Sequence, residues 1–224
     1  MHEYEDRYGV SPSAFLYAIQ EPCVFLQKVI NISGATVVMD PKADVVRAAI
    51  VCSTHLNVWP VPDFCDGDMV TCIVRTKIHG DIYVVSLYCD GEKQPIPEKL
   101  KTLYGKAKKD RMQVLALGDL NAHSSALWSS KKTDARGKAW EKFVFDKGLR
   151  VLNQGDKFTY IGPTGQSIVD VNIATPKVAD MVKHWATVDQ VPSTDHVLNE
   201  FVLLTVECWT IRPPGYNLDK CKWN

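Results

Sequence analysis

Residues 69–88 read MVTCIVRTKIHGDIYVVSLY, which is two runs rich in Val, Ile and aromatic residues on either side of Gly80-Asp81. Such runs are typical of buried strands, and the Gly-Asp pair predicts a hairpin turn between them. Pro97–Asp110 then predicts a helix that begins with a proline and ends in lysines, and the apolar run Gln113–Leu117 follows it. A hairpin beside alternating helices and strands predicts a mixed sheet in an α/β domain.

The same pattern extends through most of the chain. A helix is expected over Asp134–Lys147, where apolar residues form one stripe and Gly148 follows the last turn. A weaker helical pattern covers Lys177–Lys183. Periodicity is lost from residue 207 onward, so we expect a domain over residues 1–206 and a tail over residues 207–224. The other expected strands are Ala14–Gln20, Val45–Cys52, Ile168–Thr175 and Phe201–Val206.

The composition is that of an ordinary globular protein. Hydrophobic residues make up 46% of the 224 residues and charged residues 23%, which excludes a disordered chain, a collagen or a coiled coil. The apolar runs are far shorter than the ~20 residues that a membrane span needs, and the polar N-terminal stretch predicts no targeting signal. The 26 basic and 26 acidic residues balance, so the total charge does not identify a partner. None of the seven cysteines has C-x-x-C spacing, and we expect free, buried thiols of a reducing compartment.

Four short polar signatures follow or interrupt apolar strands, and strand ends are where α/β proteins assemble their sites. Each one also has an ordinary structural explanation, as a turn, a strand terminus, an ion pair or a hydrogen-bonded Asp-His pair. The four signatures are Gln20-Glu21-Pro22, Gly118-Asp119-Leu120-Asn121, Asp170-Val171-Asn172 and Ser193-Thr194-Asp195-His196.

Taken together, these signatures contain the groups that hydrolyse a phosphoester. Glu21 and the aspartates offer the oxygen ligands that Mg²⁺ prefers. His196 can bind a phosphate oxygen or hold a proton, and Asp195 can orient it through the other ring nitrogen. Asp119 and Asn121 can position a water molecule as the nucleophile. The sequence therefore predicts hydrolysis assisted by a divalent metal ion.

In this order, the four signatures resemble the endonuclease/exonuclease/phosphatase superfamily, which includes the abasic-site endonucleases and DNase I. The chain is more closely similar to the endonuclease domain of non-LTR (LINE-type) retrotransposons, from about Ser13 to Thr205. The resemblance implies a DNase I-like, four-layer α/β sandwich in which helices flank two packed mixed sheets. Features of the insect-type elements are NAHSSALW at 121–128, DARG at 134–137, LNQG at 152–155 and FTY at 158–160.

The resemblance also implies roles for residues around the scissile phosphate. Glu21 matches the metal ligand, and Asp195, in the closing Asp-His pair, is the second metal candidate and a catalytic one. Tyr88 matches a tyrosine that contacts the phosphate, and Asn121 matches a residue that orients it.

Proton transfer is implied for the remaining positions. Asp119 matches the residue that activates the water or protonates the leaving group, and Asp170 matches the aspartate that orients His196. One feature of the family is absent: the strand, ending in an asparagine near the metal, that usually comes well before Gln-Glu-Pro has no counterpart in the twenty residues before Glu21.

The function implied is a Mg²⁺-dependent endonuclease, with Mn²⁺ as the other candidate cofactor. It would nick double-stranded DNA in the nucleus after translation in the cytoplasm, exposing a 3′-hydroxyl that primes a reverse transcriptase on the same polyprotein. Lys131, Lys132 and Arg136 follow the predicted active-site loop and are expected to contact DNA phosphates. The alternatives are an abasic-site repair nuclease, a phosphoinositide or sugar-phosphate phosphatase, and a DNA-binding domain that has lost cleavage. No membrane association is expected.

Overall fold

The computed structural model describes residues 14–25, 28–29, 34–76, 80–163, 165–188 and 194–203. The expected tail and domain boundary, Ser193 and the last three residues of the expected strand Phe201–Val206 lie outside these ranges. The larger sheet has the strand order β10-β13-β9-β8-β7-β6. Only β8 and β9 are parallel, so the expected mixed sheet is confirmed. Its strands are β6 (Val58–Pro60), β7 (Met69–Thr76), β8 (Gly80–Tyr88), β9 (Gln113–Asp119), β10 (Arg150–Val151) and β13 (Asp170–Ala174).

The hairpin expected within residues 69–88 is present, but its turn is not at Gly80-Asp81. Gly80 pairs with Thr76 and Asp81 with Arg75, so both residues belong to strand β8. Gly80 has a φ of 77°, a conformation that glycine adopts without steric cost at the end of a hairpin connection. The glycine therefore marks the first residue of the returning strand, and the prediction of the turn position was wrong.

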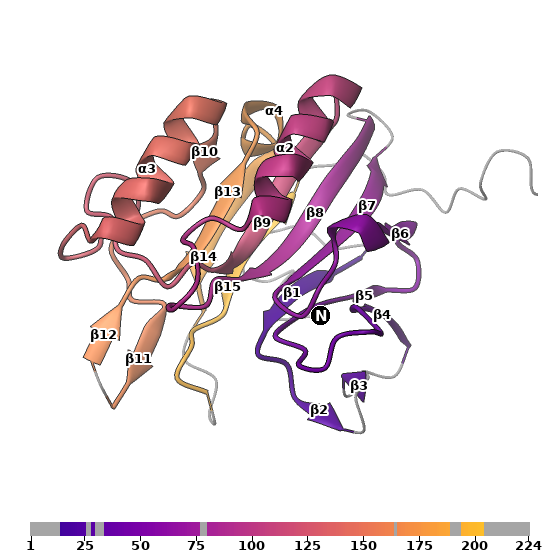
Figure 1. Ribbon diagram of the computed structural model, residues 1–224, viewed down its shortest axis with the longest axis horizontal. Coiled ribbons are helices and arrows are strands. Elements are labelled where there is room, and N and C mark those ends of the chain that lie inside the picture. The colour runs from indigo at the N-terminus through magenta and orange to yellow at the C-terminus, as the bar shows by residue number, and fades with distance from the viewer. Residues whose placement is uncertain are drawn as a thin grey trace, which may run out of the picture.

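Two helices cover one face of the larger sheet (Figure 1), and both lie within a residue of their expected bounds. They are α2 (Glu98–Asp110) and α3 (Ala135–Lys147). The Asp134 side chain caps α3 by accepting a hydrogen bond from the Gly137 amide, and Gly148 ends the helix with a φ of 63°. The core beneath the helices includes the fully buried Leu100, Leu103 and Trp140 packed with Val85, Val114 and Val171.

A second sheet packs against the opposite face of the larger one. It has the order β1-β5-β4, with β1 (Leu16–Gln20), β5 (Ala48–Ser53) and β4 (Ala35–Val38). Residues of this sheet, such as Ile50 and Val38, share a core with Val84 and Leu115 of the larger sheet. The expected DNase I-like α/β fold with two packed sheets is confirmed.

The chain after β13 forms a strand where a helix was expected. The helical turn α4 covers only Pro176–Ala179, and β14 (Val182–Thr187) then pairs with β15 (Asn199–Leu203). The prediction of a helix over Lys177–Lys183 was thus wrong for its second half. Trp185 and Phe201 pack into the core between the sheets, and this tertiary burial overrides a weak helical pattern.

Two short hairpins lie at the bottom of the molecule in the view of Figure 1. One is formed by β2 (Val24–Phe25) and β3 (Lys28–Val29), and the other by β11 (Tyr160–Gly162) and β12 (Gly165–Ser167). A short 3₁₀ helix, η1, covers Pro62–Phe64.

In the part of the chain that is described, no helix is long and apolar enough to cross a membrane. The five described cysteines are all free thiols; four are buried and Cys23 is exposed.

Candidate active site

Three of the predicted site residues lie side by side at the ends of three central strands of the larger sheet. The edge of the sheet formed by these strand ends holds the candidate site. Tyr88 ends β8 and pairs with Asp119, which ends the parallel strand β9. Asp170 begins the antiparallel strand β13 and pairs with Asp119 from the other side. Because β8 and β9 end where β13 begins, residues separated by up to 82 positions in the sequence meet in one row across three strands.

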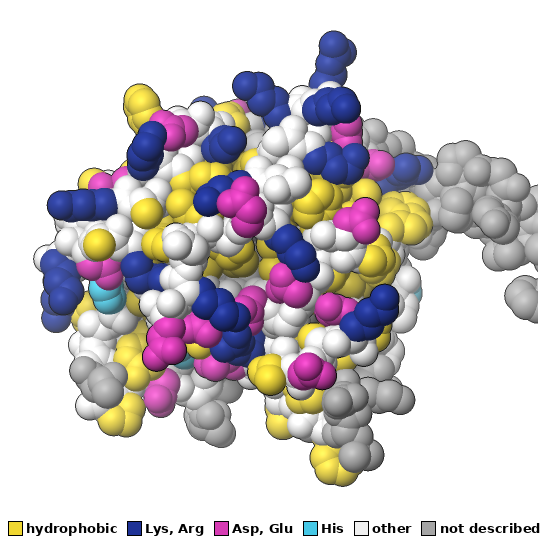
Figure 2. All heavy atoms as spheres, in the orientation of Figure 1, with side chains coloured by type: hydrophobic (Ala, Val, Ile, Leu, Met, Phe, Trp, Pro, Cys, Tyr) yellow, Lys and Arg dark blue, Asp and Glu magenta, His cyan; other side chains and the backbone are white. Residues whose placement is uncertain are grey.

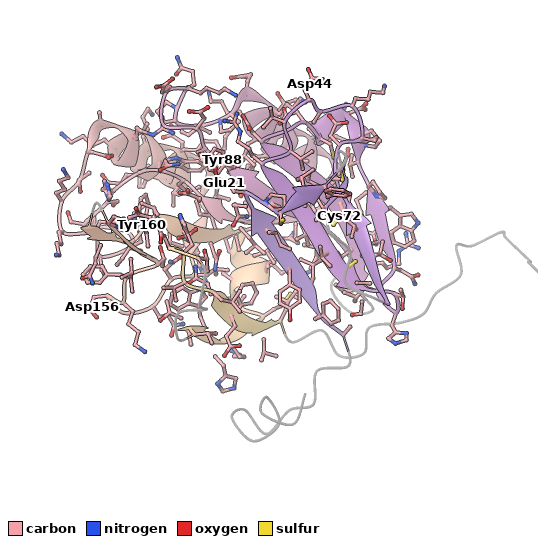
Figure 3. All side chains as sticks on the ribbon, turned by 90° about the horizontal axis from the view of Figure 1, so that it is seen from below. Glu21, Asp44, Cys72, Tyr88, Asp156 and Tyr160 are labelled. Carbon is pink, nitrogen blue, oxygen red and sulfur yellow. The ribbon has the colours of Figure 1, made fainter. Side chains whose placement is uncertain are left out.

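Gln20 connects the second sheet to this row. Its Nε2 donates to Ser86 Oγ at 3.0 Å and to the Leu117 carbonyl at 3.4 Å, and Ser86 Oγ donates to the Ile19 carbonyl at 3.1 Å. These bonds hold the end of β1 against β8 and β9. Glu21 comes next, so its exposed carboxylate is delivered to the edge where Tyr88 lies, as the view from below shows (Figure 3).

Glu21 has a backbone conformation that is unusual for a residue with a side chain. Its φ is 48°, and its amide donates to the Arg47 carbonyl at 2.9 Å. Residues other than glycine rarely adopt such a φ unless the surrounding structure fixes it, and such strain is concentrated at functional sites. Within Gln20-Glu21-Pro22, the glutamine therefore joins the two sheets and the glutamate places its carboxylate near Tyr88, while its role as a metal ligand stays a prediction.

Asp119 is the buried carboxylate in the middle of the row. Its side chain is only 4% exposed, and burial together with the negative charge of Asp170 raises the pKa of Asp119 to about 7. The Asn121 amide and the charge of His196 oppose that rise. A carboxyl group with a pKa near neutrality can both give and accept a proton, which suits a general acid or base.

Asn121 lies directly against Asp119. Its amide donates to Asp119 Oδ1 at 2.8 Å, and its Nδ2 donates to the Cys89 carbonyl at 3.1 Å and to Asp119 Oδ2 at 3.3 Å. Its φ of 44° is again in the left-handed region. The sequence Gly-Asp-Leu-Asn is therefore a strand end followed by a strained loop, and the loop turns the asparagine back onto the aspartate.

His196 and Asp170 form a hydrogen-bonded pair. His196 Nδ1 lies 2.9 and 3.1 Å from the two carboxylate oxygens, and this hydrogen bond is the main cause that raises the pKa of His196. The orientation by Asp170 that the resemblance implied is thus what the geometry shows. Asp195 is exposed, and its carboxylate lies beside Gly162, so it does not orient His196 as the alternative assignment expected.

Two sequence features that had no assigned role hold Asp170 in place. Asn153, of LNQG, donates from Nδ2 to the Asp170 carbonyl at 2.9 Å. Thr159, of FTY, accepts hydrogen bonds at Oγ1 from the amides of Val169 and Asp170, both at 3.0 Å. Tyr160 packs edge-on against the His196 ring, with the ring centroids 5.1 Å apart. These stretches therefore support the His-Asp pair.

Arg47, which no pattern in the sequence singled out, lies against Tyr88. Its guanidinium lies over the Tyr88 ring, with Cζ 5.1 Å from the centroid, and forms ion pairs with Asp68 at 2.6 Å and with Asp90 at 3.0 Å. Burial and the negative charges of Glu21 and Asp119 raise the pKa of Tyr88, and Arg47 opposes that rise. Arg47 follows no recognisable pattern in the sequence, because its partners lie 21 and 43 residues away.

The three residues expected to contact DNA lie in two different environments. Lys131 and Lys132 are exposed and border a hollow of about 530 Å³, together with His123, Phe158 and Tyr160. Lys131 Nζ lies 5.0 Å from the centroid of the Phe158 ring. In Figure 2, basic side chains stand out along the upper outline of the molecule, and acidic and basic side chains lie next to one another in its lower half.

Arg136 is only partly exposed and donates to backbone carbonyls. Its Nε bonds to the Asn121 carbonyl at 2.9 Å, and its Nη1 bonds to the carbonyls of Gly91 and Lys93 at 3.1 and 2.7 Å. These bonds engage Nε and Nη1, whereas Nη2 is buried without a hydrogen-bond partner. Arg136 thus lies in a different environment from the two lysines, and its contact with DNA phosphates stays a prediction.

The oxygen donors at this edge fit a weakly held divalent cation. Among the described residues, no three His, Cys, Asp or Glu side chains are arranged to enclose a metal. Mg²⁺ typically keeps several water molecules and binds through one or two carboxylates and the substrate's phosphate. Glu21 can supply such a carboxylate. Asp195 forms no side-chain bond within the described chain, so its role as a second ligand stays a prediction.

Comparison with known proteins agrees with this arrangement. The family model described as endonuclease-reverse transcriptase matches residues 82–199. The endonuclease domain of TRAS1, a telomere-specific non-LTR retrotransposon, is 27% identical with a TM-score of 0.74, and the match covers 92% of this chain and 91% of that one. No curated protein matches this chain.

Two AP endonucleases show likeness in fold alone. The enzyme from Archaeoglobus fulgidus is 15% identical with a TM-score of 0.56, covering 90% of this chain and 91% of that one. The Leishmania major enzyme LMAP is 10% identical with a TM-score of 0.58, covering 87% and 78%.

Proposed function

This chain belongs to the endonuclease–reverse transcriptase family, and we propose that, as an endonuclease domain of the non-LTR retrotransposon type, it nicks one strand of double-stranded DNA with the help of Mg²⁺. One observation carries the proposal. Asp119, with its pKa raised to about 7, lies in one row with Asp170, which holds His196, beside the exposed carboxylate of Glu21. The row and its two neighbours thus bring a proton-transfer group, a hydrogen-bond donor and an oxygen ligand to the same place.

The side chains divide the reaction among them. Asp119 accepts the proton of the attacking water or gives one to the leaving oxygen, and Asn121 orients the phosphate. His196, held at Nδ1 by Asp170, presents its Nε2 toward a phosphate oxygen, and its raised pKa favours the protonated ring. The Tyr88 hydroxyl donates to the same phosphate. Mg²⁺ or Mn²⁺, held by Glu21 with Asp195 as the other candidate ligand, would supply Lewis-acid stabilisation of the charge at phosphorus.

Membership of the family supports a biological role for the nick. The nick would leave a 3′-hydroxyl that primes a reverse transcriptase on the same polyprotein, and the domain would act on chromosomal DNA in the nucleus. Lys131 and Lys132, beside the hollow next to Tyr160, would hold the phosphates that flank the cut. The AP endonucleases share the fold only, so no observation on this chain favours abasic-site repair.

Nicking of supercoiled plasmid tests the proposal. Wild-type protein with Mg²⁺ should convert supercoiled plasmid to open circles, whereas EDTA or Asp119→Asn should abolish conversion and Asp156→Asn, an exposed position, should not. A DNA polymerase should extend the nicks directly, which requires a 3′-hydroxyl. Folded wild-type protein that binds DNA but never nicks it would support the cleavage-defective alternative. Cleavage confined to an abasic duplex would support the repair nuclease.

A further inference from the structure

Arg136 connects the two loops that follow strands β8 and β9. Its Nε donates to the carbonyl of Asn121, two residues after the end of β9, and its Nη1 donates to the carbonyls of Gly91 and Lys93, which follow β8. From this geometry we infer that Arg136 is a positioning residue: it fixes Asn121 relative to Tyr88 and Asp119. The catalytic part of this inference rests on the proposed nuclease function.

Asn121 needs such an external constraint. Its φ of 44° is disfavoured for a residue with a side chain, and this conformation points Nδ2 at Asp119 and at the Cys89 carbonyl. The bond from Arg136 is made to the carbonyl of Asn121 itself, so it opposes rotation of that peptide group. Without the guanidinium, the loop can relax to an ordinary φ, and the Asn121 amide then leaves the phosphate site.

The backbone around Arg136 is held by several hydrogen bonds, so the side chain extends from a fixed position. Asp134 Oδ1 accepts from the amides of Gly137 and His123, at 2.6 and 3.3 Å, and the Asp134 amide donates to the His123 carbonyl at 3.0 Å. A methyl group at Gly137 would overlap the His123 carbonyl oxygen, so only glycine permits this approach. The sequence Asp134-Ala135-Arg136-Gly137 thus seats the first turn of α3 on the active-site loop.

The shape of the guanidinium makes arginine specific here. Its planar fork sends Nε and Nη1 to carbonyls on two different loops, while Nη2 is buried and without a hydrogen-bond partner. The ammonium of a lysine is one point donor and cannot occupy both nitrogen positions. Arg136→Lys therefore keeps the charge but loses the connection, which separates a positioning role from an electrostatic one.

Kinetics of nicking distinguish these roles. We expect Arg136→Lys and Arg136→Gln to lower kcat by about tenfold or more, while KM and the salt dependence of DNA binding stay within about twofold of wild type. The matched control is Lys138→Gln, which removes an exposed charge from the same helix and should leave kcat unchanged. If Arg136 contacted a phosphate instead, Arg136→Lys would restore wild-type kcat and Arg136→Gln would flatten the salt dependence. That pattern would overturn the inference.

A double-mutant cycle tests whether Arg136 acts through Asn121. Asn121→Gly removes the amide side chain at a position where glycine tolerates the φ, so it adds no strain. In that background, Arg136→Lys should lower kcat by less than about threefold, because the group that it positions is already gone. An equal loss in both backgrounds would show independent action and would contradict the inference.

Hydrogen exchange measures the connection without any need for activity. In Arg136→Lys, amides in residues 89–94 and 119–124 should exchange faster than in wild type, while the strands of the larger sheet keep their protection. Unchanged exchange in both loops would contradict the inference, and so would faster exchange throughout the sheet, which would indicate a role in global stability. A wild-type protein without nicking activity would refute the proposed function alone, because exchange would still decide whether Arg136 fixes the loops.

Discussion

The two halves of the candidate site are built to different degrees. On the side of β9 and β13, the protein itself supplies nearly every partner: Asp119 is held by Asn121, and His196 by Asp170, which Asn153 and Thr159 hold in turn. On the side of β1, the exposed Glu21 carboxylate extends from one strained residue. Groups that move protons must be preorganised, whereas a weakly bound cation and the DNA phosphate can complete the other half.

The largest effect is expected from removing Asp119, the proton-transfer group in the half of the site on β9 and β13. Asp119→Asn should lower kcat for nicking by about a thousandfold, the scale of a general acid or base. The midpoint of thermal unfolding should not fall, because the amide removes a buried charge next to Asp170. A loss of activity that follows unfolding, or nicking within about tenfold of wild type, would contradict the assigned role.

The half of the site on β9 and β13 also depends on the close packing of β9 against β8. A methyl group at Gly118, in β9, would overlap the Leu87 carbonyl oxygen of β8, so Gly118→Ala should lower the free energy of unfolding by about 2 kcal/mol. Gly105→Ala is the matched control, because that helical glycine faces open space and alanine favours the helix by roughly 1 kcal/mol. Urea denaturation measures both. Equal stability of the two variants would show that β8 and β9 can separate freely.

In the half of the site on β1, a substitution of Glu21 should instead change the dependence of nicking on Mg²⁺ concentration. Glu21→Gln removes a charged oxygen ligand, so the Mg²⁺ concentration needed for half-maximal nicking should rise on the order of tenfold. Rescue by high Mg²⁺ would be the sign of a ligand. A variant that stays inactive at any Mg²⁺ concentration would place Glu21 in the chemical step.

Stability should depend on pH through Asp119. Its folded-state pKa is raised to about 7, so folding favours the protonated form, and that stabilisation is lost as pH rises toward 7. In EDTA, the free energy of unfolding of the wild type should fall relative to Asp119→Asn between about pH 4 and 7, by at most about 1.4 kcal/mol per pH unit. Parallel curves for the two proteins would mean that Asp119 titrates normally.

The smallest effect is expected at the exposed lysines. Lys131→Ala together with Lys132→Ala should reduce the slope of log binding constant against log salt by up to about two, since each phosphate contact contributes about one. Filter binding to a short duplex at several salt concentrations measures the slope. An unchanged slope would remove both residues from the DNA-binding surface.

The sequence predicted those parts that depend on local pattern. Apolar runs located the strands β7 and β8 within residues 69–88, and an initial proline and a following glycine located α2 and α3 to within one residue. The turn at Gly80-Asp81 and the helix over Lys177–Lys183 failed because strand pairing and the burial of Trp185 decide those segments.

The site was predictable as a set of residues but not as a network. The sequence singled out Tyr88, Asp119 and Asp170, but their juxtaposition depends on one parallel and one antiparallel strand pair. The role of Arg136 could not be inferred, because its carbonyl partners at Gly91 and Lys93 lie more than 40 residues away and leave no side-chain signature. The same holds for Arg47 over Tyr88.

If the half of the site on β9 and β13 is preorganised and a cation completes the half on β1, variants in the two halves should respond differently to Mg²⁺. Mg²⁺ can be titrated in the plasmid-nicking assay for wild type, Asp119→Asn and Glu21→Gln side by side. We expect Asp119→Asn to lower the maximal rate with an unchanged Mg²⁺ midpoint, and Glu21→Gln to shift the midpoint and largely recover the rate. Rescue of Asp119→Asn by Mg²⁺, with no rescue of Glu21→Gln, would show that the roles of the two halves are reversed.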